Sequence, residues 1–216
     1  MAAEYRVELN GRWKLEDLYI FPHAFSQTYA FTYCFDSDLD PRDAERIEIA
    51  LQTYPWGGGY SYVNIYKVLQ TQVPVRDRPT IASIHYGSPG WLDILLNTDV
   101  AIQVAKSVGI LLGTAVAAAE SYKKIYKTLS EINSLRRKRE LEKTEVTQAQ
   151  LKSIVKTSEL IAKYVGFGSL KELHDRTGSA EIRLRVLLAH YRRLKILLEF
   201  VQKHKATLPE KRKEDD

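Results

Sequence analysis

Apolar residues recur every three or four positions through a long stretch in the second half of the chain. This spacing puts them on one side of a helix, and at 1.5 Å per residue the stripe is roughly 47 Å long. A small domain needs less to cover its core, so another part of the chain or a second copy must pack against it. We interpret the larger members as an oligomer seam: Val104, Val108, Leu111, Tyr122, Ile125, Leu129 and Ile132, with Ala101, Ala115 and Ala118 between them.

Two further stretches repeat this spacing and predict two more helices. Thr147 with Gln150 is a capping box that opens a helix ending at Gly166 and Gly168. Its apolar side carries Leu151, Ile154, Ser158, Ile161 and Val165, and the last helix carries Ala180, Leu184, Leu187, Tyr191, Leu194, Leu198 and Val201. We expect the long helix to begin at Ser88-Pro89 and to reach about residue 142. Three such helices predict an antiparallel, coiled-coil-like bundle.

The first ninety residues predict a mixture of strands and helices. Tyr5–Leu9 alternates as a strand does, and Asn10-Gly11 is typical of a tight turn, so Arg12–Leu15 would return as a hairpin. Three helices follow, one from Pro22 to about Phe35, one opened by Asp40-Pro41 with Ile47 and Leu51 on its buried side, and one containing Tyr62, Ile65, Tyr66 and Leu69. Thr80–Tyr86 reads as a strand that joins the hairpin.

A change in composition near residue 90 divides the chain. All prolines except Pro209 fall at or before Pro89, and the first ninety residues hold nine of the thirteen tyrosines. We therefore expect a mainly α protein. Residues 1–90 would form a small α+β domain of about three strands and three helices, 91–208 a helical bundle for oligomerisation, and 209–216 a charged, disordered tail.

Positive charge gathers in the second half. Residues 1–90 carry eight Lys and Arg against eleven Asp and Glu, which leaves 24 and 16 of the chain's 32 and 27 for the rest. The candidate polyanion-binding residues are Arg136, Arg137, Lys138, Arg139, Arg183, Arg192 and Arg193. Interspersed glutamates such as Glu131, Glu140, Glu142 and Glu145 favour the alternative of a solvated outer face.

Residues 100–119 are nearly apolar and contain Gly109 and Gly113, a spacing that lets helices approach closely in membranes. Gln103 and Lys106 interrupt the segment, and its alanines contribute little hydrophobicity. Membrane insertion is therefore a third alternative that the sequence does not favour.

The sequence contains no motif for catalysis or for a metal. Asp36–Asp40 resembles the start of a calcium loop, but Pro41 and Ile47 stand where that loop needs Gly and Glu. The five histidines show no metal-ligand spacing, and Cys34 is the only cysteine. We expect no enzyme activity, cofactor or metal. The single cysteine, and an N-terminus without a secretory signal, indicate the cytoplasm.

Residues His85-Tyr86-Gly87-Ser88-Pro89-Gly90-Trp91 carry a resemblance. A strand ending in Tyr-x-Ser-Pro before a long helix is similar to a loose group of uncharacterised bacterial proteins with a small sheet domain and a helical tail. The resemblance covers about residues 80–96. It implies a bacterial or phage origin and brings no activity.

These observations predict a cytoplasmic, non-enzymatic interaction or adaptor protein that associates with itself, most simply as a dimer. An unidentified protein partner would bind the N-terminal part through its tyrosines and Trp56, because aromatic side chains dominate binding energy. A regulator that binds nucleic acid without sequence preference, through the basic helices, is the alternative. A membrane-acting effector that uses residues 100–119 is the third.

Overall fold

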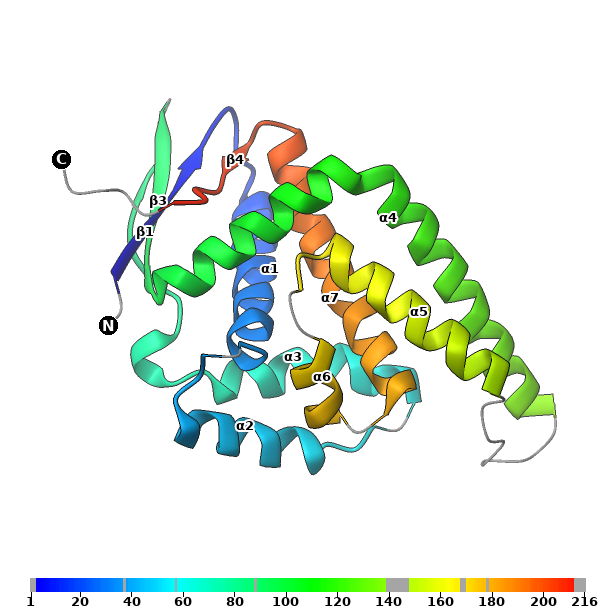
Figure 1. Ribbon diagram of the computed structural model, residues 1–216. Coiled ribbons are helices and arrows are strands. Elements are labelled where there is room, and N and C mark those ends of the chain that lie inside the picture. Colours follow the sequence, from blue (N-terminus) through cyan, green and yellow to red (C-terminus); the bar gives the residue numbers. More distant parts are fainter. Residues whose placement is uncertain are drawn as a thin grey trace.

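The computed structural model describes residues 3–211 except 37, 57, 88, 139–147, 168–169 and 178. The described chain is mostly helical, with a small antiparallel sheet in the order β2-β3-β1-β4. Figure 1 shows the sheet at one end of the molecule and helices α4 (Thr98–Lys138) and α5 (Gln148–Tyr164) extending to the other. Helices α1 (Leu15–Cys34) and α7 (Ala180–Gln202) lie side by side between these ends.

Strand β1 (Ala3–Leu9) forms as its alternating pattern predicts. Tyr5, Val7 and Leu9 are buried on the inner face of the sheet, where the Tyr5 ring stacks on Phe25 of α1. The predicted return strand at 12–15 is wrong, although Gly11 has the positive φ of a turn. The chain enters α1 at Leu15, because Trp13 is buried against α1 and α7 and Asp17 caps the backbone N–H of Lys14.

The edge of β1 that the predicted hairpin would have filled pairs with β4 (Ala206–Thr207), near the other end of the chain. The N–H of Asn10 donates to the carbonyl of Lys205 at 2.8 Å. Helix α1 begins seven residues before the predicted start at Pro22, which lies inside it. Its aromatic side chains, including Phe21, Phe25 and Phe31, form the centre of the core.

The helices predicted next are confirmed. Helix α2 (Pro41–Gln52) is capped by the Asp40 carboxylate, which accepts from the N–H of Arg42. Ile47 and Leu51 are fully buried, as predicted. Helix α3 (Gly58–Gln72) buries Ile65, Tyr66 and Leu69 and is followed by the short helix η1 (Val75–Asp77).

Residues 90–96 form a strand and not the first turns of the long helix. Strand β3 (Gly90–Leu96) pairs with β1 on one side and with β2 (Thr80–His85) on the other. Leu92, Ile94 and Leu96 alternate on the inner face of the sheet and are buried there, so a period of two replaces the predicted helical period. A Cβ on Gly90 would meet the carbonyl oxygen of His85 at 2.8 Å, so the β2–β3 turn needs glycine at this position.

This strand changes the meaning of the motif at 85–91. The Tyr-x-Ser-Pro segment joins two paired strands, and the long helix begins at Thr98, where the side chain of Asn97 accepts from the N–H of Asp99. The boundary expected at residue 90 therefore runs between β2 and β3, and the sheet draws strands from both sides of it.

Helices α4, α5 and α7 contact one another, and α5 folds back along α4 (Figure 1). Figure 1 also shows a bend in the middle of α4, the region in which Gly109 and Gly113 weaken helix propensity. The buried residues of α5 include Ile154, Ser158 and Ile161, as predicted, whereas Leu151 is exposed. Thr147 and Gly168 lie outside the described residues. Gly166 ends α5 with a positive φ, and α6 (Leu170–Thr177) leads on to α7.

Candidate functional site

The predicted oligomer seam lies inside a single chain. Val104, Val108 and Leu111 are at most 2% exposed, and Ile125 and Leu129 are buried as well. The Tyr122 ring stacks on Tyr191 of α7 at 5.0 Å between centroids. Ile132 lies on α4, but its side chain is outside the described part. Because α4 packs on α1, α5 and α7 of its own chain, the five buried residues are not available to a second copy, and their burial gives no support to an oligomer.

The two basic clusters are not equally placed. Arg183 is buried, and burial lowers the pKa of its guanidinium. Arg193 lies over the Tyr66 ring at 5.3 Å, while Arg192 is exposed. Of the first cluster, Arg136, Arg137 and Lys138 form the end of α4 with side chains outside the described part, and Arg139 lies outside the described residues. The structure therefore does not present Arg183 to a polyanion.

Two reactive side chains are buried in the core. Burial raises the pKa of the Cys34 thiol to about 12, and its Sγ lies 3.6 Å from the carbonyl oxygen of Leu69. Burial lowers the pKa of His190 to about 3, and its ring stacks on Phe31 at 3.8 Å between centroids. Both groups are thus held in their neutral forms and away from solvent.

The aromatic side chains expected to bind a partner are divided between the core and the surface. Tyr19 and Tyr86 are 70% and 66% exposed. Tyr5, Tyr29, Tyr33 and Tyr66 are buried. Trp56 is half-buried, and its indole N–H donates to the carbonyl of Leu51 at 3.0 Å.

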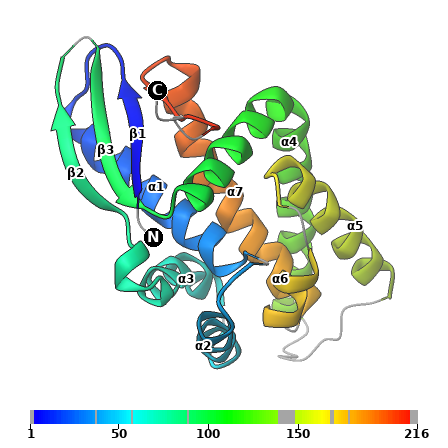
Figure 2. The ribbon, with the colours of Figure 1, turned by 60° about the vertical axis from the view of Figure 1, so that its left-hand side comes forward.

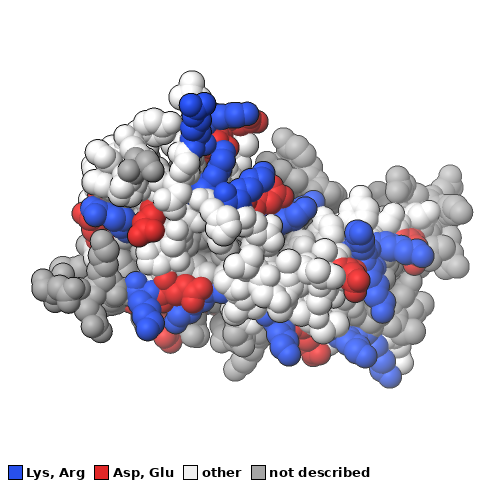
Figure 3. Space-filling model, turned by 90° about the horizontal axis from the view of Figure 1, so that it is seen from above, with Lys and Arg blue, Asp and Glu red and all other residues white. Residues whose placement is uncertain are grey.

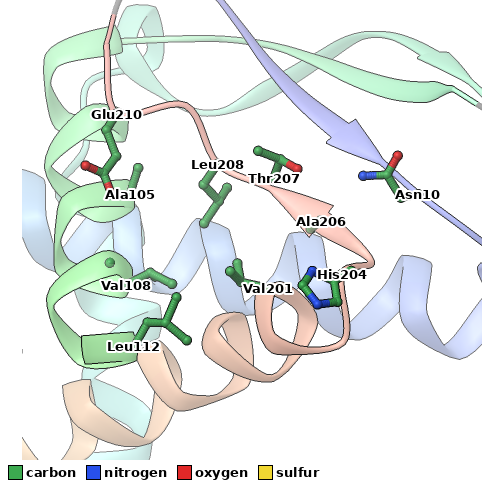
Figure 4. Close-up of a pocket in the computed structure, with 11 residues that line it drawn as sticks. Asn10, Ala105, Val108, Leu112, Val201, His204, Ala206, Thr207, Leu208 and Glu210 are labelled. Atoms are coloured by element: carbon green, nitrogen blue, oxygen red, sulfur yellow. The ribbon is translucent and has the colours of Figure 1, made fainter. Parts of the chain in front are cut away.

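A pocket of about 220 Å³ opens between α4, the end of α7 and β4 (Figure 4). Its walls are mainly apolar, with Val108, Leu112 and Val201 among them, and the polar groups of His204 and Glu210 lie at different sides. Gly109 permits this arrangement, because a Cβ there would come within 2.4 Å of the Glu210 carboxylate. The pocket has room for a small amphipathic molecule. Among the described residues, no group of three or more His, Cys, Asp or Glu is placed to hold a metal ion.

The outer face of the sheet carries a polar cluster that the sequence did not reveal. Both carboxylate oxygens of Asp93 accept from the Arg6 guanidinium, at 2.6 and 3.0 Å, and one also accepts from the Ser83 hydroxyl at 2.7 Å. Asp93 is buried beneath these partners although it faces away from the core. Beside it the His85 ring stacks on Trp91 at 4.2 Å, and the Arg6 guanidinium lies over the same indole.

This cluster positions a strand and does not build a nucleophile. The Ser83 hydroxyl donates directly to a carboxylate, with no imidazole between them as a base. The cluster holds β2 against β3, since Ser83 and His85 on β2 lie opposite Asp93 and Trp91 on β3 and contact them. Sequence analysis missed it because Arg6 and Asp93 lie 87 positions apart and only the unexpected strand β3 brings them together.

The strand fixed in this way is the most exposed element of the sheet. β2 is an edge strand, paired with β3 alone among the described strands, and all six of its residues are exposed. Figure 2 shows it at the rim of the sheet. Ile81 and Ile84 lie opposite the buried Ile94 and Leu92, yet they are 55% and 52% exposed. The outer edge of β2 is therefore our candidate functional site.

The chain was compared with protein-family models, with curated proteins and with solved structures, and none of them matches it.

Proposed function

We propose that this chain is a self-associating interaction protein whose copies join through the outer edge of β2. The observation that carries the proposal is an uncharged edge strand, Thr80–His85, in which every residue is exposed to solvent. An edge strand presents unpaired backbone N–H and C=O groups, and proteins commonly protect such edges with lysine, proline, a β-bulge or a covering loop. Of these, β2 has one irregularity, between Ile81 and Ser83. The six residues of β2 include no lysine, arginine, acidic residue or proline.

The inner side of β2 supports the same proposal. Ile81 and Ile84 point to the inner face of the sheet, the face on which α1 packs. At the rim, however, their side chains remain more than half exposed. Covering them would remove apolar surface from water at a gain of about 25 cal/mol per Å². A neighbouring strand would do this while it pairs the backbone.

A second copy of β2 meets both needs. The register of β2 against β3 shifts between Ile81 and Ser83, and this irregularity puts Ile81 and Ile84 on the same face of β2. In a two-fold, antiparallel pairing, Ile81 of one copy would lie opposite Ile84 of the other, so the four isoleucines would cover one another on that face. Identical uncharged strands pair without like-charge repulsion. The two sheets would continue into one. Because the contact is small, we expect a reversible equilibrium between monomer and dimer.

The proposal keeps three of the features predicted from the sequence but gives each of them a smaller role. Coiled-coil packing of α4, α5 and α7 would stiffen each copy and would not join two copies. The cytoplasm remains the proposed location on account of the single cysteine. A strand from a different protein could use the same edge, which would make the chain an adaptor.

Sedimentation equilibrium of the wild type and two variants tests the proposal. The apparent mass of the wild type should rise from 24.8 kDa towards twice that value as the concentration increases. Ile84→Lys places a charge on the edge without opening the core and should remain monomeric. Ile49→Lys is a matched control, because Ile49 is 55% exposed on α2, and it should associate like the wild type.

Two results would overturn the proposal. One is a wild type that stays at the monomer mass at every concentration. The other is an Ile84→Lys variant that dimerises as the wild type does.

A further inference from the structure

The outer side of α4 carries an uncharged surface that the core does not use. Between Lys106 and Glu120 the helix contains no charged residue. On its outer side Val116 is 77% and Leu112 45% exposed, and Gly113 and Ala117 are exposed with them. We call these four residues, Leu112, Gly113, Val116 and Ala117, the α4 surface. A Cβ on Gly113 would meet nothing within 4 Å.

This helix is long and apolar enough to cross a membrane on length and composition, with a mean hydropathy of 1.7 in its best window within Thr98–Glu131. Its other side belongs to the core, where Val108, Leu111 and Ala118 are buried. Insertion across a bilayer would pull that core apart. In addition, the fourteen residue steps from Lys106 to Glu120 span about 21 Å at 1.5 Å per step, less than a hydrocarbon core of about 30 Å.

Positive charge follows the α4 surface along the helix. Lys123 and Lys127 stand seven and eleven residues after Val116, so they lie on the same side of the helix, and Lys124 is exposed beside them. Lys106 is exposed before it. The nearby acidic groups are Glu120, which is exposed, and Glu210, whose carboxylate lies over Gly109. Lysines therefore outnumber carboxylates around the surface.

Figure 3 views the molecule from above Figure 1, with α4 towards the viewer. Uncharged atoms form a broad area in the middle of this face, with Lys and Arg side chains grouped on several sides of it and fewer Asp and Glu. Exposed apolar side chains with a basic surround match the interface of a bilayer, because lysines meet lipid phosphates while the apolar side chains enter the boundary with the acyl chains.

We propose that the α4 surface binds peripherally to a bilayer that contains anionic lipids, with the bent middle part of α4 at the membrane (Figure 1) and its inner side still in the core. A second copy fits less well, because it would bring two sets of lysines together. A nucleic acid would use the lysines but would leave Val116 and Leu112 in water. The proposal is independent of the β2 edge, which is a separate surface on the sheet.

Co-sedimentation with vesicles tests the proposal. The wild type should sediment with vesicles of phosphatidylcholine and phosphatidylserine and less with phosphatidylcholine alone, and high salt should weaken the binding. Val116→Asp should lower the bound-to-free ratio by about tenfold or more. Val75→Asp is the matched control, since Val75 is 79% exposed on η1, and it should bind like the wild type. Circular dichroism should show the same fold in all three proteins.

A double variant, Lys123→Gln with Lys127→Gln, tests the charged part and should remove most of the preference for phosphatidylserine. Four results would overturn the proposal. They are no binding to either vesicle, equal binding to both, equal losses in the two valine variants, and an effect of Val116→Asp on the sedimentation mass without any effect on vesicle binding. The last result would assign the surface to a second copy.

Discussion

The inner side of α4 and the strand β2 both lack charged residues, yet the first is buried in the fold and the second is exposed to solvent. Val104, Val108 and Leu111 on α4 are almost completely buried, whereas every residue of β2 is exposed. The sequence suggested α4 as the surface that joins copies, and it predicted residues 80–86 only as a strand that joins the N-terminal hairpin. A regular apolar period indicates that a side will be covered, but it does not indicate which part of which chain covers it.

The difference follows from position in the fold. α4 is flanked by α1, α5 and α7, which bring their own apolar sides to it. β2 is the last strand of the sheet (Figure 2), and Ile81 and Ile84 on its inner face remain more than half exposed. An element in the middle of the fold thus has its apolar side covered within the chain. An edge strand keeps unpaired backbone groups and an exposed face that a partner can cover.

The largest expected effect comes from truncating two neighbouring leucines on α4, which tests whether its inner side is buried. Leu111 is fully buried and Leu112 is 45% exposed. Leu111→Ala should lower the free energy of unfolding by about 2–5 kcal/mol, and Leu112→Ala by less than about 1 kcal/mol, in urea denaturation. Equal losses would show that α4 does not bury the side that the structure assigns to the core.

The pH dependence of stability tests the same core next to α7. His190 is held neutral with a pKa of about 3, against 6.5 in an unfolded chain. The unfolded state therefore takes up a proton below about pH 6.5 that the folded state does not. Stability should fall as the pH drops from about 6.5 towards 3, by at most about 1.4 kcal/mol per pH unit from this residue. The slope is measured by urea denaturation at several pH values.

His190→Phe is the variant that isolates this contribution. It keeps an aromatic ring beside Phe31 and removes the titrating group, so the slope in this pH range should decrease. An unchanged slope would assign the acid sensitivity to other groups.

The polar cluster on the outer face of the sheet tests what holds β2 in place. The expected loss of stability is smaller than that for Leu111→Ala. Asp93→Asn keeps the shape of the side chain but removes its charge, and the Arg6 guanidinium keeps only its longer ion pair with Glu4, at 3.5 Å. We expect a loss of about 1–3 kcal/mol in the free energy of unfolding. Asp99→Asn, at an exposed position at the start of α4, is the control and should change stability by less than about 1 kcal/mol. Equal losses would mean that the cluster does not hold β2 in place.

The sequence predicted elements that local signals specify. The Asp40 cap, the alternation of Tyr5, Val7 and Leu9 and the period of α7 are local, and all three are confirmed. β3 was missed because its seven residues contain alternating and helical spacings together, and only pairing with β1 decides between them. The candidate site was missed because the position of a strand at an edge depends on the order of all the strands in the sheet. Neither the residues of β2 nor Asp93 indicate that order in the sequence.

Hydrogen exchange at two protein concentrations tests the central claim most directly, since it reads β2 and α4 in one sample. If copies join through the β2 edge, amides in Thr80–His85 should exchange more slowly at high concentration than at low concentration. Amides along the buried side of α4 should not change, because that side is already covered within each chain. Protection that grows on α4 while β2 exchanges at one rate at both concentrations would contradict the account.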